Sequence, residues 1–343
     1  MVTRVSILVC MPARQARVTS ADVARLAGVS RATVSYVLND TPRQTISAST
    51  RGRVLDAAAR LGYAPSAAAR TLRTGRSDVV LCLLPDWPIG PEVGSMLNNL
   101  SAALARQGLT FVVHPGNRED RPIAEIWKAI TPAAVIAYAD FSQAEIAAMR
   151  AAGVALVVAL LGRGPQRGRR ELEMPQQLVG RRQAGHLAAT GHRVIGYGYP
   201  DDERLRIFAE PRLAGVRTEC RVHRLGGPSL ETVRLEPFHA AEAVRRWRAA
   251  GVTGICAYND EVALAVLAGV RLLGLHAPAD LAVIGVDDIP PARLAVPALT
   301  TVTTDQATMA AHLADTVVAA INGTPGPDVP SADLITLVRR ESA

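Results

Sequence analysis

Residues 18–39 read VTSADVARLAGVSRATVSYVLN, and this stretch decides the fold of the N-terminal part. On either side of Gly28, apolar residues recur at helical spacing, so each half has one apolar face. These residues are Val23, Leu26 and Ala27 before the glycine and Val34, Val37 and Leu38 after it. Gly28 tolerates the positive φ at which a helix stops and turns sharply. With Ser20 and Ser30 placed to cap the helix starts, the pattern predicts two short helices joined by a tight turn.

The face of the second helix opposite its apolar stripe carries small or hydrogen-bonding residues, one cation and one aromatic ring. They are Arg31, Ala32, Ser35, Tyr36 and Asn39. Small side chains allow close approach to DNA, and polar ones can bond phosphates and base edges in the major groove. The alternative is an ordinary helical hairpin in a globular core, because pairs of short amphipathic helices are common.

The basic charge of the chain is concentrated at this end. The 343 residues carry a formal net charge of +7, and residues 1–76 hold twelve arginines against three aspartates. A basic module on a near-neutral body is typical of a protein that binds a polyanion. A basic solvated tail is the alternative, but it would not have the helical periodicity and caps.

Other features of the composition exclude several classes of protein. Four widely spaced cysteines, Cys10, Cys82, Cys220 and Cys256, form no CxxC pair, so we expect neither a zinc site nor a disulfide framework. No apolar run is long enough to span a membrane. Residues 1–17 make a poor signal peptide and are expected to be a disordered extension, or an artefact with Met11 as the true start. Without a nucleophile elbow, a phosphate-binding glycine loop or metal-ligand spacing, we expect no enzyme and no cofactor.

A third helix is expected over residues 48–61, with Ser47 as its cap. Its apolar positions Val54, Leu55, Ala58 and Leu61 form a stripe at helical spacing. Three helices of this size make a small bundle with the second helix exposed. The Tyr63 side chain is expected to pack into the core of this bundle.

The alanine-rich segment 66–75 could form a helix of one or two turns, which is marginal alone in water. We therefore expect it to order only on a partner. Leu72 between Arg70 and Arg73 suits an apolar wedge in a minor groove, with the arginines on phosphates. A plain linker is the alternative.

From Ser77 onward strands and helices alternate, which is typical of parallel sheets covered by helices on both faces. Strands are expected at 79–84, 109–114, 133–138, 154–161, 194–199, 220–225, 254–257, 281–286 and 334–338, and helices at 91–107, 123–130, 143–152, 180–189, 211–217, 240–250 and 261–273. The run is too long for one open sheet, so we divide it into two lobes near Gly191. Ligands of such folds bind at the carboxyl ends of the strands, here between the lobes.

Several motifs after residue 17 together resemble the LacI family of transcriptional regulators. Besides residues 18–39, they are residues 61–65, 69–75, 191–193, 259–260, 285–288, 299–302 and 340–342. Each motif alone is weak, but their order and spacing together are specific. The resemblance implies an N-terminal all-α helix-turn-helix bundle with a hinge helix, followed by a two-lobed α/β core like that of periplasmic binding proteins. It also implies a cytoplasmic, nucleoid-associated regulator, most simply a repressor.

The resemblance further implies a homodimer on a palindromic operator in double-stranded DNA, controlled by a small-molecule effector in the interlobe cleft. The domains would be residues 18–64 for DNA binding, 65–76 as the hinge and 77–343 for effector binding and dimerisation. The N-lobe would cover about 77–190 with a return at about 300–330, and the C-lobe about 191–299 with the C-terminal strand.

Site residues follow from the resemblance position by position. Family members read bases where this chain has Arg31, Ala32 and Tyr36, and hold phosphates where it has Thr19, Ser30, Ser35 and Asn39. Leu72, flanked by Arg70 and Arg73, matches the leucine that intercalates at the operator centre. Positions that bond the effector correspond to Arg212, Asn259 and Asp287, with a further usual contact at Asp86 and with Trp87 as the one obvious aromatic residue beside it.

Three departures from the family pattern bear on specificity. Tyr36 stands where an arginine commonly reads guanine in a bidentate contact, so the operator half-site should differ there. The sequence WPIGP at 87–91 replaces an aromatic Asn-Pro-Phe-Phe segment, and MPQQ at 174–177 replaces a turn containing Asp or Asn. The effector class therefore stays open among sugars, sugar derivatives and nucleobase-like molecules. The alternative is a small-molecule-binding or ligand-independent DNA-binding protein whose effector site has degenerated.

Overall fold

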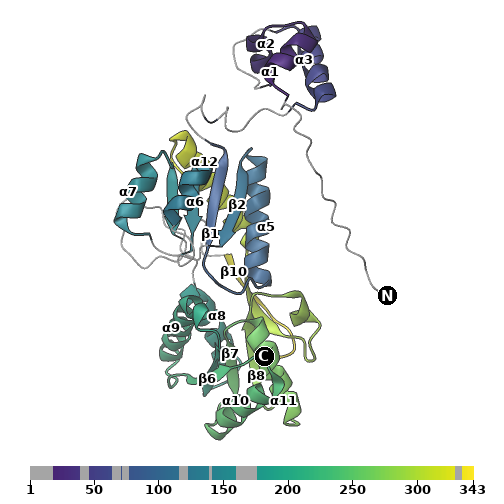
Figure 1. Cartoon of the computed structure of the whole chain (residues 1–343). Helices are drawn as coiled ribbons and strands as arrows, with labels where there is room; N and C mark the ends of the chain where they lie inside the picture. The colour runs from purple at the N-terminus through teal and green to yellow at the C-terminus, as the bar shows by residue number, and fades with distance from the viewer. Residues whose placement is uncertain are drawn as a thin grey trace. The chain divides into compact units, whose positions relative to one another are not determined.

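The chain folds in the computed structural model as two units, Met1–Ser77 and Asp78–Ala343 (Figure 1). The structure describes residues 18–38, 46–63, 71, 77–115, 123–138, 141–159, 176–328 and 334–343. The predictions for Asn39, Arg70, Leu72 and Arg73, and for residues 1–17, concern residues outside this described part.

Three helices form the described part of the first unit, α1 (Ser20–Ala27), α2 (Arg31–Leu38) and α3 (Ala48–Leu61). They pack around a small core that includes Val23, Val34, Val37 and Val54. Gly28 ends α1 with a φ of 64°, the left-handed conformation expected at this turn. Tyr63 packs against the same core and is partly buried, as the sequence predicts.

Two of the three predicted helix caps are confirmed. Ser30 Oγ accepts a hydrogen bond from the Thr33 N–H at 3.1 Å, and Ser47 Oγ accepts one from the Thr50 N–H at 3.2 Å. Ser20 does not cap α1, since it is the first residue inside that helix. The cap is Thr19, whose backbone N–H donates to the Asp22 carboxylate at 2.9 Å. Asp22 stands three residues after Thr19, which is the spacing of a capping box.

Two leucines of the predicted apolar stripes are not part of this core. Leu26 is 44% exposed and Leu55 is 48% exposed. In a bundle of three short helices only a narrow strip of each helix faces the others, and small residues such as Ala57 and Ala58 fill it on α3. A leucine one position away from Val54 is turned about 100° around the helix and meets solvent.

The first lobe of the second unit is a parallel sheet with the order β2-β1-β3-β4. Its strands are β1 (Val79–Leu84), β2 (Thr110–Pro115), β3 (Ala134–Ala137) and β4 (Leu156–Ala159), and its helices are α5 (Pro91–Arg106), α6 (Ile123–Ile130), α7 (Gln143–Ala151) and α12 (Gln306–Asn322). Alternate residues of β1 point to opposite faces, as in any strand. Cys82 packs with α5 and α12, while Leu81 packs with α6 and α7.

The second lobe has a six-stranded sheet with the order β10-β9-β8-β7-β5-β6, in which β10 alone is antiparallel among the described strands. Its strands are β5 (Ile195–Pro200), β6 (Ser229–Val233), β7 (Gly254–Ala257), β8 (Ala282–Val286), β9 (Thr300–Thr304) and β10 (Ile335–Val338), and its helices are α8 (Gln176–Ala189), α9 (Arg206–Val222), α10 (Pro237–Ala249) and α11 (Asp260–Leu272). Short 3-10 turns, η1 (Glu203–Leu205) and η2 (Pro290–Arg293), complete it. Helices α10 and α11 pack on one face of this sheet, and α8 and α9 on the other.

One predicted strand is wrong. Residues 220–222 are the last turn of α9, and the strand of this region is β6, which the sequence pattern did not indicate. Cys220 continues the buried helical face of Leu213 and Val216, so its apolar neighbours extend a helix and do not start a strand. The return to the first lobe also differs from the expected start at about 300. Residues 300–304 form β9 in the second sheet, and α12 is the element that packs on the first sheet.

No helix in the described ranges has both the length and the apolar composition needed to cross a bilayer.

Candidate functional site

Helix α2 presents a polar face to solvent and an apolar face to the bundle. Arg31, Ala32 and Tyr36 are exposed, while Val34 and Val37 on the other side are buried. Among the residues that the structure describes, no ion pair is formed by Arg31. Its guanidinium is therefore available to a ligand on this face.

Two of the predicted phosphate contacts, Thr19 and Ser30, lie at the two helix starts. The Thr19 hydroxyl donates to Asp22 at 2.7 Å, and the Ser30 hydroxyl lies 2.9 Å from the Thr33 hydroxyl. Both residues are exposed, and Ser35 is partly buried on α2. Thr19 and Ser30 thus hold the helix starts in place, and a phosphate contact would be an additional role.

The second unit contains a cavity of about 670 Å³ between its two lobes. Its lining comes from segments that follow the strands, including Trp87 after β1, Tyr138 after β3 and Asp287 after β8. The carboxyl ends of the strands of both sheets therefore converge on it, as the parallel topology predicts. Four predicted effector residues line this cavity, namely Trp87, Arg212, Asn259 and Asp287.

Asp86 does not line the cavity. Its side chain is 80% exposed and lies 3.3 Å from a guanidinium nitrogen of Arg204, which belongs to η1 of the second lobe. Arg204 is also bound by Asp202 at 2.7 Å. Asp86 thus forms an exposed ion pair between the lobes, and the structure gives no support to a direct contact with the effector.

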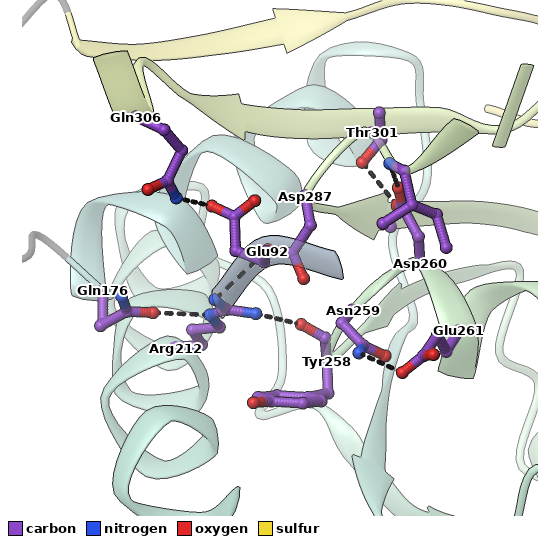
Figure 2. Close-up of polar contacts among 12 residues, drawn as sticks. Glu92, Gln176, Arg212, Tyr258, Asn259, Asp260, Glu261, Asp287, Thr301 and Gln306 are labelled. Atoms are coloured by element: carbon purple, nitrogen blue, oxygen red, sulfur yellow. Dashed lines mark hydrogen bonds and ion pairs between the residues drawn. The ribbon is translucent and has the colours of Figure 1, made fainter. Parts of the chain in front are cut away.

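Arg212 is buried and lies at the centre of a group of polar residues in the cavity (Figure 2). Its Nε donates to Gln176 Oε1 at 2.7 Å, and its Nη1 donates to the Tyr258 carbonyl at 2.6 Å. The Asp287 carboxylate lies 3.6 Å from Nη2, and the Tyr258 ring lies under the guanidinium at 4.9 Å. This cation is fixed by four groups before any ligand arrives.

Two glycines bring the helices that carry this network into backbone contact. A Cβ on Gly180 of α8 would lie 1.9 Å from the Arg212 carbonyl oxygen, and a Cβ on Gly215 of α9 would lie 1.9 Å from the Gln177 carbonyl oxygen. No side chain larger than hydrogen fits at either position. The close crossing of α8 and α9 is therefore what places Gln176 within reach of Arg212.

Asn259 and Asp260 organise the start of α11. The Asn259 Oδ1 accepts from the Val262 N–H at 2.9 Å and caps the helix, and its Nδ2 lies 3.4 Å from Glu261. Asp260 is fully buried and accepts from the Thr301 hydroxyl at 2.6 Å and from the Ile289 N–H at 2.9 Å. Burial raises the pKa of Asp260 to about 7, although both hydrogen bonds oppose the rise.

Sequence reasoning missed several polar residues of the cavity, among them Glu92, Gln176 and Gln306. Glu92 is in the first turn of α5 and accepts a hydrogen bond from the Gln306 amide of α12. Burial, and after it the nearby charge of Asp287, raise the pKa of Glu92 to about 8. The available signal was an acidic residue shortly after Trp87, but an acidic residue in the first turn of a helix also simply favours the helix start.

An aromatic cluster forms another part of the wall. Trp87 packs edge-to-face on Tyr138, with ring centroids 5.2 Å apart, and on Phe208, with centroids 4.8 Å apart. Tyr138 and Trp87 belong to the first lobe and Phe208 to the second, so the cluster joins the lobes across the cavity.

Comparisons with known proteins match part of each unit. The family model for bacterial regulatory proteins of the lacI family matches residues 19–66, and that for a periplasmic binding protein-like domain matches residues 184–343. The regulator MalR of Streptomyces coelicolor is 30% identical over 94% of this chain and 95% of its own length. GalR of Escherichia coli is 28% identical over 94% of this chain and 95% of its length. A structure of the lac repressor dimer bound to operator and the anti-inducer ONPF has a TM-score of 0.78 at 22% identity, covering 95% of this chain and 99% of that one.

Proposed function

Since the chain belongs to the LacI family of bacterial transcriptional regulators, we propose that it represses transcription as a homodimer on a palindromic operator, under the control of a small-molecule effector in the interlobe cavity. It is a DNA-binding regulator and not an enzyme. Residues 18–64 would bind DNA, 65–76 would form the hinge, and 77–343 would bind the effector and dimerise. Since operator DNA is its partner, we place it in the cytoplasm with the nucleoid.

The observation that carries this proposal is the exposed face of α2. Arg31, Ala32 and Tyr36 stand out from the bundle on one side of a short helix whose other side is buried. The helix is preceded by α1 and the Gly28 turn, inside the segment that the family model matches. A helix with small and polar residues on its exposed side can enter the major groove and reach base edges.

Contacts outside the described residues complete the proposed DNA interface. Asn39 would add a phosphate contact beside Thr19, Ser30 and Ser35, as the family resemblance implies. Leu72 would act as the wedge at the operator centre, with Arg70 and Arg73 on the flanking phosphates.

A second copy of the chain is the partner that a palindromic operator requires. In the second lobe, Leu294 is 78% exposed and Val296 is 88% exposed, both just before β9. Two large exposed apolar side chains so close together suit a surface that a second copy of the chain covers. We assign this surface to the homodimer.

The cavity supports effector control over the alternative of a degenerated site. Its volume of about 670 Å³ lies in the range of small-molecule pockets. It holds a buried arginine fixed by Gln176, Tyr258 and Asp287, together with the Asn259 amide. Burying a cation costs free energy. A site that no longer binds a ligand would have no reason to retain such a buried arginine.

A mobility-shift assay with the DNA upstream of its own gene, followed by selection from random duplexes, tests the proposal. We expect an inverted repeat to be selected, and we expect Arg31→Ala to reduce the preference for it over random DNA by at least about tenfold, the usual cost of one specific base contact. If no palindromic site is bound at moderate salt, the proposal is wrong.

Arg25→Ala is the matched control for this experiment. Arg25 lies on α1 and is exposed, with an ion pair to Asp22 at 2.7 Å. Its removal takes away the same charge, so salt-dependent binding to any DNA should weaken in both variants. Only Arg31→Ala should change the selected sequence.

A further inference from the structure

We propose that the cavity binds an effector that carries a protonated amine, and that Glu92 is the residue that selects it. This inference rests on the proposed function and names the chemical class of the effector. It follows from where the Glu92 carboxyl group lies, from the charges around it and from the aromatic wall of the same cavity.

Glu92 belongs to the first lobe, and its carboxyl group lies between Gln306 of the same lobe and Asp287 of the second lobe. Figure 2 shows it between Gln306 and Asp287, above the Arg212 network. The hydrogen-bond partner of Glu92 is the neutral amide of Gln306. Within the described part of the chain, neither a lysine nor an arginine pairs with Glu92. This acid therefore faces the cavity with a neutral partner.

The one cation that lines the cavity in the described residues is Arg212. Its nitrogens are already bonded to Gln176 and the Tyr258 carbonyl and paired with Asp287. It has little capacity left to balance Glu92.

The other acids of the cavity divide into two groups. Asp201 lies 3.2 Å from Arg234, and Asp202 lies 2.7 Å from Arg204, so both acids at the rim are compensated. Glu261 contacts only the Asn259 amide in the described chain. Glu261, together with Glu92 once it ionises, thus offers negative charge that a cationic ligand would balance.

The aromatic wall suits the same kind of ligand. The rings of Trp87, Tyr138 and Phe208 pack together in the cavity wall, and the apolar side chains of Ile89 and Leu235 also line the cavity. Aromatic faces attract ammonium groups, and the attraction grows when water is excluded. A phosphate or carboxylate ligand would instead be repelled by Asp287 and by the ionised form of Glu92.

The pKa of Glu92 supports this reading. Burial and the charges of Asp287 and, more weakly, Asp260 raise the pKa to about 8, while Arg212 opposes the rise. At pH 7 the carboxyl group is then mostly protonated, and an ammonium group beside it would favour the ionised form. Binding should release a proton, so affinity for an amine should increase as the pH rises from 6 toward 8.

The test uses ligand-observed NMR on the full chain with matched probes at millimolar concentration. The pairs are benzylamine with benzyl alcohol and D-glucosamine with D-glucose, and D-glucose 6-phosphate is the anionic probe. We expect each amine to bind about tenfold more tightly than its neutral partner, the effect of one charge-assisted hydrogen bond. Benzylamine stays protonated between pH 6 and pH 8, and its affinity should increase over that range.

Glu92→Gln should remove both the amine preference and its pH dependence, because glutamine resembles the protonated acid and keeps a partner for Gln306. The matched control is Glu231→Gln, which removes an acid outside the cavity that is paired with Arg246 at 2.7 Å and should keep the preference. Circular dichroism of both variants shows whether they fold.

Equal responses to both members of each pair, including no response to either, would overturn the inference. So would tighter binding of the phosphate, or an amine preference that survives in Glu92→Gln. The mobility-shift assay on the same preparations separates the two proposals. Operator binding without an amine preference contradicts only the inference about the effector. A failure to bind any palindromic DNA contradicts the proposed function.

Discussion

Tyr36 gives the proposed recognition helix a different base-contacting group from the arginine that LacI-family members commonly carry there. Its ring is exposed on α2, and the neighbouring Val37 is buried in the bundle. A tyrosine hydroxyl offers one donor and one acceptor position, whereas an arginine offers two parallel N–H donors that match guanine. The two side chains should therefore prefer different bases at the same operator position.

Tyr36→Arg should shift the operator preference toward a guanine at one position of each half-site. A good bidentate contact discriminates against a wrong base by about 1–3 kcal/mol, so the change should be about tenfold or more. Selection from random duplexes with the wild type and the variant would measure it. If the selected half-site stays the same, the register that we assign to α2 is wrong.

Some cavity residues could be predicted from the sequence and others could not, depending on how far away in the chain their partners lie. Arg212, Asn259 and Asp287 stand within local motifs, so the resemblance could indicate them, and the structure brings all three to one cavity. Glu92 and Gln306 meet only because α5 and α12 pack together on the first sheet. No local pattern contains a contact between residues so far apart, and we could not predict it.

At the scale of elements, the crossing of α8 and α9 holds the Arg212 network of the cavity in place. The two helices touch through Gly180 and Gly215, each against a backbone carbonyl of the other helix. Side chains can turn away from a clash, but a backbone cannot. The position of Arg212 therefore depends on residues that do not touch the cavity.

Gly215→Ala should destabilise the second unit by about 1–3 kcal/mol or more, the usual cost of overpacking, because the new Cβ would lie 1.9 Å from the Gln177 carbonyl oxygen. Thermal unfolding followed by circular dichroism measures the change. Gly94→Ala is the control, since no atom lies within 4 Å of its Cβ position in α5. There alanine should stabilise the helix by up to about 1 kcal/mol. Equal melting temperatures for the two variants would contradict the close crossing.

Elements with strong local signals were predicted well, and those that depend on tertiary packing were not. The strand pattern of β1 and the helix pattern of α6 matched the observed bounds, because apolar runs and flanking polar residues mark them. Residues 220–225 carry apolar side chains that fit either a strand or the end of a long helix. Packing of Cys220 beside Val216 favours the helix, and only the fold shows that packing.

For the whole molecule, the central question is how the helix-turn-helix parts of two copies of the chain together bind one operator with high affinity. A single helix-turn-helix unit reads half of a palindrome, and linking two of them makes the second binding event intramolecular. The increase in affinity then depends on the surface that joins the copies, which we assign to Leu294 and Val296 in the second lobe. That surface lies in a different unit from α2.

Leu294→Asp should therefore separate the dimer without unfolding the chain, since a side chain that is 78% exposed contributes little to the core. Sedimentation velocity should show the monomer, and operator affinity should fall by about 10²–10⁴-fold, because the gain from bivalent binding is lost. Binding to an isolated half-site should not change. Val222→Asp introduces the same charge at an exposed apolar residue of α9 and should leave both the dimer and the affinity intact. If Leu294→Asp remains dimeric, another surface joins the two copies, and the assignment of this one is wrong.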